Sequence, residues 1–450
     1  MKTFSNKVLT AMLAALLTAM LAACGTGDGG VATDSGTDSS NAAPFGGVAT
    51  SDNELVGEVN VWTWEAFENL VAVHEDFNEA FPYIDVVFTN VAAEDMPMRL
   101  QVTAAAGDMP QAVWIEINQR GRILSLDILE TLSDPPYNAN PDDFFDFMMP
   151  VHSTPDGRWV TVEVSTPISG LIYKRDLAER FIGTDDPDEI ADLIQTWDDM
   201  FDLGLMIRQE TNGEVYLFGS IQELEQILRG QRAVSFVQDG VLNIEDALGP
   251  VLDEVIRFYA AGLVAPANMW TPEWNASFNR SINLFNSGPT WYPTWVIEAQ
   301  GTENEGNWGL TEAPRGGFLQ GGTGVGIPSA AENKHLGWEY IRWMYLSREG
   351  AISNRDHMSY LTGYTPAWRE EGFYSGANAF FGGQDLYRFF AERIAINMAT
   401  TRPVSEFDIE VIDALDVALM AIKDANGQIT SGELLDNMRS EIVNLVPDLR

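Results

Sequence analysis

The sequence predicts an α/β fold, because strand-like and helix-like segments alternate in its first folded part. Residues 65–81 place their apolar side chains at helical spacing before Pro82, and residues 95–106 are predicted to form a helix that ends at Gly107. Strand-like runs surround them, at residues 58–64, 84–88 and 112–117. This order predicts parallel strands joined by helical crossovers.

Strands and helices also alternate through the rest of the chain. Residues 159–173 predict a pair of strands around Pro167, and Thr196 is a predicted N-cap of the next helix. The sequence further predicts helices within residues 220–264, 335–347 and 407–423. A chain of 450 residues with this content favours two domains or one large composite domain.

Composition and charge exclude several classes of protein. Apolar residues make up 45% of the chain, which is enough for a hydrophobic core and excludes a disordered protein. The formal net charge is −40, from 26 basic and 66 acidic residues. Such a surface repels phosphate, so we expect neither a nucleic acid partner nor direct binding to an anionic membrane surface.

The N-terminal residues have the pattern of a secreted, lipid-anchored protein. Residues 1–23 combine a basic head with an apolar stretch, as a signal peptide does. They end in Leu-Ala-Ala before Cys24, which resembles a bacterial lipoprotein cleavage site and implies that Cys24 carries the lipid. Residues 24–54 are predicted to be a flexible tether. We therefore expect an outward-facing protein at the cell membrane; the alternative is an ordinary signal peptide with a stray cysteine.

The sequence lacks the common catalytic motifs. It contains no GxxxxGK[ST] phosphate loop, no GxSxG nucleophile elbow and no HExxH metal motif. Cys24 is the single cysteine, which excludes an internal disulfide and a cysteine-based zinc site. We therefore expect no catalytic residues, no metal site and no cofactor.

Several segments follow one another in an order that resembles a known family. They include VNVWTWE, LQVTAAAGDMPQAVWIEINQRGRILSLDILETL, RWVTVEVSTPISGLIYKRDL, QTWDDM and SINLFNSGPTWYPTW. Over residues 57–445 this order is similar to the extracellular solute-binding proteins of bacterial ABC importers, the family that includes maltose-binding protein. The resemblance implies a non-enzymatic, monomeric protein that captures a sugar or oligosaccharide and delivers it to the transmembrane subunits of an ABC permease.

The resemblance also implies a periplasmic-binding-protein-like fold, in which two parallel-sheet lobes close on a ligand about a hinge. The hinge strands are expected at residues 162–165 and 318–322. The expected lobe limits are residues 55–162 plus 322–370 for lobe one and 163–321 plus 371–450 for lobe two.

Candidate binding residues come first from the predicted strand ends. Ligands in open α/β sheets bind beyond the carboxyl ends of the strands. Trp64 and Glu65 follow the first strand, and Glu116 and Asn118 lie at the end of the third, so these side chains are expected at the site.

The resemblance adds further positions. Trp64 and Glu65 match ligand contacts of the family, Asn118 matches a sugar-binding carboxylate, and Glu163 matches an acidic sugar ligand at the crossing. Trp291 matches a tryptophan that stacks on a sugar ring. The family's aromatic residue near the start of the last long helix has no counterpart here, which implies a ligand or a pose that differs from maltose.

These residue types suit a sugar, because aromatic rings cover the apolar face of a pyranose while carboxylates and amides bind its hydroxyl rim. The predicted ligand-binding residues are Trp64, Glu65, Glu116, Asn118, Glu163, Trp274, Trp291, Tyr292 and Trp295. A polyamine or other organic cation uses the same groups and stays open. A surface carbohydrate-active enzyme is the other alternative.

Overall fold

The computed structural model describes residues 55–398 and 401–449. All of them belong to one compact unit, Gly47–Arg450. The predicted signal peptide, Cys24 and the tether at residues 24–54 lie outside the described residues. Within the described ranges, no helix is both long and apolar enough to span a membrane.

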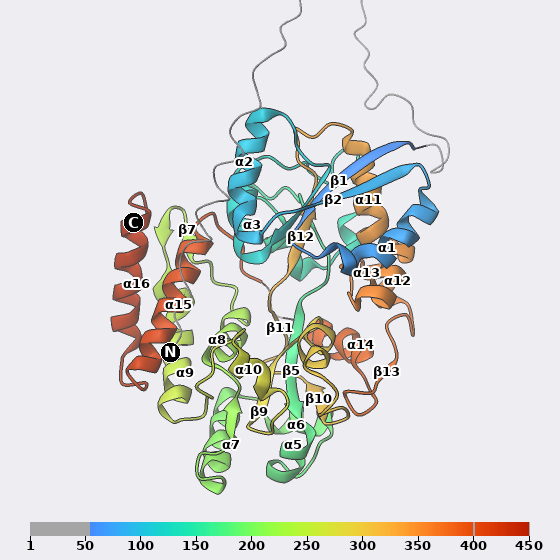
Figure 1. Ribbon diagram of the computed structural model, residues 1–450. Helices are drawn as coiled ribbons and strands as arrows, with labels where there is room; N and C mark the ends of the chain where they lie inside the picture. Colours follow the sequence, from blue (N-terminus) through green and yellow to red (C-terminus); the bar gives the residue numbers. More distant parts are fainter. Residues whose placement is uncertain (1–54, 399–400, 450) are drawn as a thin grey trace, which may run out of the picture. The chain divides into compact units, whose positions relative to one another are not determined.

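The first sheet has five strands in the order β2-β1-β3-β12-β4 (Figure 1). β1 pairs in parallel with β2 and β3, as predicted, while β12 runs antiparallel to both β3 and β4. The strands are β1 (Gly57–Thr63), β2 (Ile84–Asn90), β3 (Ala112–Glu116), β4 (Val162–Glu163) and β12 (Thr323–Gly326). The helices that pack with this sheet include α1 (Phe67–Ala80), α2 (Met96–Ala106), α3 (Ile117–Ser125) and α11 (Lys334–Leu346).

The second sheet has the order β10-β5-β9-β6, and β11 also pairs with β5. β5 is antiparallel to β9, β10 and β11, and only β6 and β9 are parallel. Both sheets therefore mix parallel and antiparallel strands, and the expectation of purely parallel sheets in the lobes is wrong. The reason is that strands such as β12, which follow a crossing between the sheets, run antiparallel to their neighbours. The strands are β5 (Ile168–Lys174), β6 (Tyr216–Phe218), β9 (Asn283–Pro289), β10 (Trp308–Thr311) and β11 (Phe318–Leu319).

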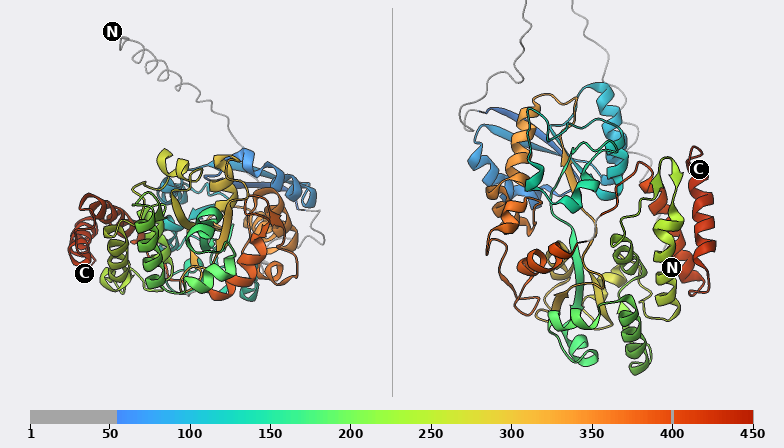
Figure 2. Two further views of the ribbon diagram at one scale, coloured as in Figure 1. Left: turned by 90° about the horizontal axis from the view of Figure 1, so that it is seen from below. Right: turned by 180° about the vertical axis from the view of Figure 1, so that it is seen from behind.

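The larger remaining helices surround the second sheet. The chain from β5 to β9 forms α5 (Arg175–Phe181), α6 (Pro187–Leu193), α7 (Trp197–Glu210), α8 (Ile221–Gly230), α9 (Ile244–Ala260) and α10 (Pro272–Ser277), and the C-terminal part adds α15 (Asp408–Asp424) and α16 (Ser431–Leu445). The predicted N-cap Thr196 is confirmed, because its side chain accepts a hydrogen bond from the Asp199 backbone N–H at the start of α7. Helices α9, α15 and α16 lie side by side along one flank (Figure 2).

Shorter elements lie between these. They include the helices α4 (Met149–His152), α12 (Arg348–Ser353), α13 (Thr365–Arg369) and α14 (Leu386–Phe389), and two small hairpins, β7 (Val237–Gln238) with β8 (Val241–Leu242) and β13 (Ala377–Asn378) with β14 (Gln384–Asp385). Short 3-10 and π-helices also occur, among them the π-helices Pro293–Ile297, Asn354–Met358 and Phe390–Ile394.

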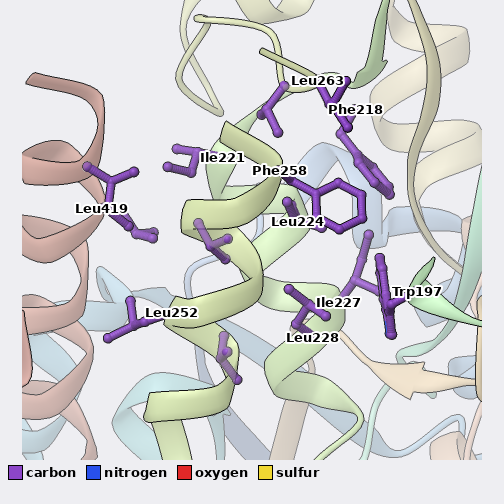
Figure 3. Close-up of a cluster of buried hydrophobic side chains, with 14 of the residues drawn as sticks. Trp197, Phe218, Ile221, Leu224, Ile227, Leu228, Leu252, Phe258, Leu263 and Leu419 are labelled. Carbon is purple, nitrogen blue, oxygen red and sulfur yellow. The ribbon is translucent and has the colours of Figure 1, made fainter. Parts of the chain in front are cut away.

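Each sheet has its own hydrophobic core. The core beside the second sheet brings together α7, α8, α9 and β6, and Figure 3 shows the ring of Phe258 among Trp197, Phe218 and Leu224. A separate cluster packs β1 and β3 against α1 and α11. Two cores of this kind are the physical basis of two lobes.

Two crossings join strands of the two sheets directly. β4 ends in the first sheet and β5 begins in the second, and β11 and β12 make the return passage. Gly322 on the return has φ +122°, and a Cβ there would lie 3.0 Å from the Pro167 ring and 3.3 Å from the Glu163 carboxylate. Glycine is needed here because the two crossings approach so closely.

A third cluster mixes residues from both predicted lobes. Ala351, Leu361 and Ala367 pack with Ile172 of β5 and with Trp274. The lobe limit expected at residue 370 therefore stays a prediction.

Candidate ligand-binding site

A cavity of about 630 Å³ lies between residues of the two sheets. This volume is within the range of roughly 300–1,000 Å³ that is typical of sites for small organic ligands. The strand ends of the first sheet form one side, and α8, the loop before α10 and the residues after β9 form the other. Seven of the nine predicted residues line it: Trp64, Glu65, Glu116, Asn118, Glu163, Trp291 and Trp295.

The ends of β1 and β3 bring the first predicted residues together. Trp64 packs edge-on against Trp114, with ring centroids 5.8 Å apart. The Glu65 carboxylate accepts a hydrogen bond from the Asn69 amide at 2.6 Å. The two strands are parallel neighbours, so their carboxyl ends meet at one sheet edge, as the sequence predicts.

Glu116 is the N-cap of α3, where its carboxylate accepts the Asn118 backbone N–H at 2.8 Å. Burial raises the pKa of Glu116 to about 7, and the hydrogen bond from Asn118 lowers it only in part. The side chain can therefore donate or accept a hydrogen bond near neutral pH. Asn118 itself is exposed at the rim of the cavity.

The ionic floor of the cavity consists of Glu163 and Arg120, which line it, and of His152 behind them; all three side chains are fully buried. The Glu163 carboxylate accepts from Arg120 at 3.2 Å and from His152 Nε2 at 3.0 Å, and its other oxygen accepts the Thr323 backbone N–H. Burial raises the pKa of Glu163, but the charge of Arg120 and the hydrogen bond from His152 outweigh it, so the net pKa is lowered. Burial and Arg120 lower the pKa of His152 to about 4, which keeps the imidazole neutral.

This arrangement changes the role expected of Glu163. Both carboxylate oxygens already accept hydrogen bonds from the protein. Glu163 therefore holds Arg120 and His152 in place beside the cavity. The Nε of Arg120, in contrast, is buried, and no described residue hydrogen-bonds to it.

The aromatic wall of the cavity consists of Trp270, Trp291 and Trp295. Trp291 is half-buried, and its indole N–H donates to the Gln320 carbonyl at 3.3 Å. The rings of Trp270 and Trp291 are nearly parallel, with an angle of 13° and centroids 6.1 Å apart. Trp295 packs near Tyr360, which also lines the cavity.

Trp274 and Tyr292 do not line the cavity, which corrects the expectation that they face a ligand. Both side chains are fully buried. Trp274 packs behind Trp270 with centroids 5.1 Å apart, and Tyr292 packs behind Trp291 at 4.6 Å. Two consecutive residues such as 291 and 292 point in different directions, so only one of them faces the cavity, and the sequence does not reveal which.

Several buried polar atoms of the cavity lining have no hydrogen-bond partner among the described residues. Ser165, Gln222, Trp295 and Gln320 supply two donors and two amide oxygen acceptors, in addition to the Nε of Arg120. An unsatisfied buried polar atom is costly, so these side chains are the part of the lining that folding leaves least satisfied.

Charged side chains at the α8 and α15 end of the cavity are mostly paired with each other. Arg229 donates to Glu225 at 2.5 Å, and Arg402 donates to Asp408 at 2.8 Å. Sequence reasoning missed this group, together with Gln222, because α8 and residues 401–416 carry no motif. The long helix α15 lines the cavity with Ile412, Leu415 and Asp416. None of these residues is aromatic, in agreement with the sequence, which lacks the family's aromatic residue near the start of this helix.

Known proteins resemble this chain in fold. A structure described as an extracellular solute-binding protein of family 1 is 19% identical and covers 86% of this chain and 99% of its own, with a TM-score of 0.76. The galacto-N-biose/lacto-N-biose I-binding protein of an ABC transporter from Bifidobacterium longum is 15% identical, with coverages of 88% and 98% and a TM-score of 0.69. The sugar-binding protein MalE from Xanthomonas citri is 16% identical, with coverages of 86% and 98% and a TM-score of 0.67.

These structures confirm the expected two-lobed fold of the maltose-binding-protein type. The sequence matches no curated protein. A family model described as bacterial extracellular solute-binding protein matches residues 72–370, which is more than half of the chain. The chain therefore belongs to the family of bacterial extracellular solute-binding proteins.

Proposed function

We propose that this protein captures a sugar or oligosaccharide between its lobes and delivers it to the membrane subunits of an ABC importer. The observation that carries the proposal is the cavity itself, which tryptophans of the aromatic wall line together with carboxylate and amide side chains. A pyranose fits this combination, because one face is apolar and the rim carries hydroxyl groups that both donate and accept.

The similar structures support a sugar as the ligand. The Bifidobacterium longum protein is described in complex with lacto-N-biose, and the Xanthomonas citri protein is described as sugar-binding. Hydroxyl groups are also suited to the mixed lining of the cavity, since Gln222, Gln226 and Gln320 carry amides that can both donate and accept.

An organic cation is a weaker candidate for the same cavity. A polyamine needs carboxylates that are not neutralised by the protein. Glu163 already pairs with Arg120, and Glu225 pairs with Arg229. The cavity therefore offers less free negative charge than the net charge of the chain suggests.

A panel of ligands tests the proposal directly. Melting temperature is measured with maltose, maltotriose, lacto-N-biose, β-1,6-galactobiose, putrescine and spermidine, because a ligand that binds only the folded state stabilises it. We expect at least one saccharide to raise the melting temperature and the amines to have no effect. Stabilisation by spermidine alone would establish the organic-cation alternative.

The binding role also implies that the ligand is not chemically changed. The family consists of solute-binding proteins, and we propose that this chain likewise turns nothing over. A saccharide that binds in the panel is incubated with the protein and analysed by mass spectrometry. Recovery of the intact saccharide is expected; cleavage would assign the protein to the carbohydrate-active enzymes.

We further propose that the protein acts as a monomer held at the outer face of the cell membrane by a lipid on Cys24. The lipoprotein-like sequence before Cys24 supports this location. Cys24→Ala is expected to leave the membrane fraction while keeping the melting temperature of the wild type. Retention of Cys24→Ala in salt-washed membranes would contradict the anchor.

A further inference from the structure

Residues 402–410, named the strap, contact the hydrophobic clusters of both sheets. The strap leads into α15, whose Val411 and Leu415 pack in the core beside the second sheet. Before that helix begins, Val404 packs instead against a cluster formed by side chains of β1, β3, α2 and α3 on the first-sheet side. The strap is therefore a link between the two lobes in addition to the two direct crossings.

Arg402 fixes the strap to the second-sheet side. Its guanidinium lies over the ring of Phe236, 3.8 Å from the centroid, and Phe236 belongs to the second-sheet core. The same guanidinium donates to the Asp408 carboxylate at 2.8 Å, where the Arg402 and Asp408 side chains are only 16% and 2% exposed. The Ser405 hydroxyl also donates to Asp408, at 2.8 Å. A charge pair buried this deeply is costly to break, so this end of the strap stays with α15.

The contact of the strap with α3 is close but easier to break. A Cβ at Gly121 of α3 would lie 1.9 Å from the Ser405 carbonyl oxygen, so the two backbones touch and only glycine fits. The neighbouring Arg122 pairs with Glu410 at 2.5 Å, with side chains that are 34% and 18% exposed. Ion pairs that reach solvent contribute little to stability. The α3 side of the strap is therefore the side that can separate.

We propose that the strap is a latch, which fastens α3 to α15 in the protein without ligand and must release α3 before a ligand enters or leaves the cavity. Arg402 and Val404 line the cavity, so a bound molecule lies against the strap. Contacts between domains that are small and partly polar permit the domains to move relative to each other, and hinge closure is one form of this motion. The inference rests on the proposed function for the ligand, but separation of α3 from α15 is measurable without one.

Small-angle X-ray scattering of the ligand-free protein tests the latch. Gly121→Ala places a methyl group against the Ser405 carbonyl, so we expect a larger radius of gyration than in the wild type. Gly432→Ala is the matched control, because Gly432 also lies in a helix and a Cβ there meets nothing within 4 Å. Both variants should keep the melting temperature of the wild type to within a few degrees, because a latch yields by opening. A steep fall in the melting temperature of Gly121→Ala with an unchanged radius would show permanent packing and overturn the latch.

Charge reversal tests the same contact without a steric clash in α3. Arg122→Glu faces Glu410 with a like charge, so the radius of gyration should rise, and Arg122→Glu/Glu410→Arg should restore it. The control is Arg388→Glu, which makes the same change beside Glu392 at a surface pair outside the cavity lining. An unchanged radius in Arg122→Glu, or no recovery in the double variant, would overturn the latch.

Stopped-flow tryptophan fluorescence with maltotriose and lacto-N-biose tests whether the latch controls ligand exchange. The dissociation rate should rise about fivefold in Arg122→Glu and change less than about twofold in Arg388→Glu. Equal dissociation rates in Arg122→Glu and the wild type would overturn the role of the strap in ligand entry and exit. Failure of the wild type to bind either saccharide would count against the proposed sugar-binding function, whereas the scattering measurements would still decide the latch.

Discussion

The aromatic wall and the ionic floor face the same cavity but are built in opposite ways. The ionic floor of Arg120, His152 and Glu163 is fully buried, and the protein already satisfies both oxygens of its carboxylate. The aromatic wall is partly exposed: Trp270 is 60% exposed, and the indole N–H of Trp295 has no partner in the described part of the chain. The same cavity thus combines a region whose charges are paired by folding with a region that a ligand would cover.

This difference separates residues that support the fold from residues that bind. Glu163 and Trp274 are buried and contact other buried groups, so their loss should reduce stability first. Trp291 and Trp270 contact the cavity, so their loss should reduce affinity first. The predictions below test this separation, in order of decreasing expected effect.

The largest expected effect is on the ionic floor. Glu163→Leu leaves the buried Arg120 charge without its partner, and this should reduce the free energy of unfolding by about 3–5 kcal/mol. Urea denaturation measures the loss. The double variant Arg120→Met/Glu163→Leu should recover most of it, because two apolar side chains can replace a buried ion pair. A double variant as unstable as the single one would show that the charge pair is not the cause.

Behind the aromatic wall, Trp274→Ala should reduce stability by roughly 3–5 kcal/mol, because it removes a fully buried ring and leaves a cavity. The molecules that still fold should bind saccharides with an affinity close to that of the wild type. Thermal melting and calorimetry on the same sample separate the two quantities. Normal stability together with lost affinity would place Trp274 in direct contact with the ligand.

Glu116 should make stability depend on pH. Its pKa is about 7 in the folded protein against an ordinary value of 4.5, so the folded state binds the extra proton between these values. The resulting stabilisation is complete below about pH 4.5 and is lost as the pH rises through about 7.

Glu116→Gln removes this contribution. At pH 8 the variant should be more stable than the wild type by roughly 1–2 kcal/mol, and at pH 5 the gain should be much smaller. Urea denaturation at the two pH values measures the difference. Glu223, whose pKa burial also raises to about 7, should keep part of the pH dependence in the variant. An equal change at both pH values would contradict a raised pKa for Glu116.

The smallest expected effect is at the contact between α3 and α15. Arg122 on α3 pairs with Glu410 on α15, and both side chains are partly exposed. Arg122→Ala should therefore reduce the free energy of unfolding by only about 0.2–1 kcal/mol, and less at high salt. Urea denaturation at about 50 mM and about 500 mM NaCl checks this. A salt-independent loss of more than about 2 kcal/mol would show that Arg122 stabilises the fold by packing and not by the ion pair.

Much of the first sheet and its side of the site could be predicted from the sequence. Trp64, Glu65, Glu116 and Asn118 lie at the cavity because parallel strands bring their carboxyl ends to one edge, and that rule needs only the order of elements. Their contact with a ligand stays a prediction.

The other side of the site depends on tertiary packing that no local pattern encodes. Trp291 and Tyr292 are adjacent, yet only Trp291 faces the cavity. The exposed side of Trp270 follows from a positive φ that the sequence does not specify. The mixed strand directions also escaped prediction, because they arise from the crossings between the sheets and not from strand–helix–strand units.

Calorimetric titration of Trp291→Ala with the saccharide that most stabilises the wild type tests the central claim most directly, namely that the cavity binds sugar through its aromatic wall. The account predicts an affinity loss of about 2–4 kcal/mol, because a central stacking ring is removed. It also predicts a small change in melting temperature, because the ring is only half-buried without ligand. A steep fall in melting temperature with unchanged affinity per folded molecule would contradict the account and make Trp291 a core residue.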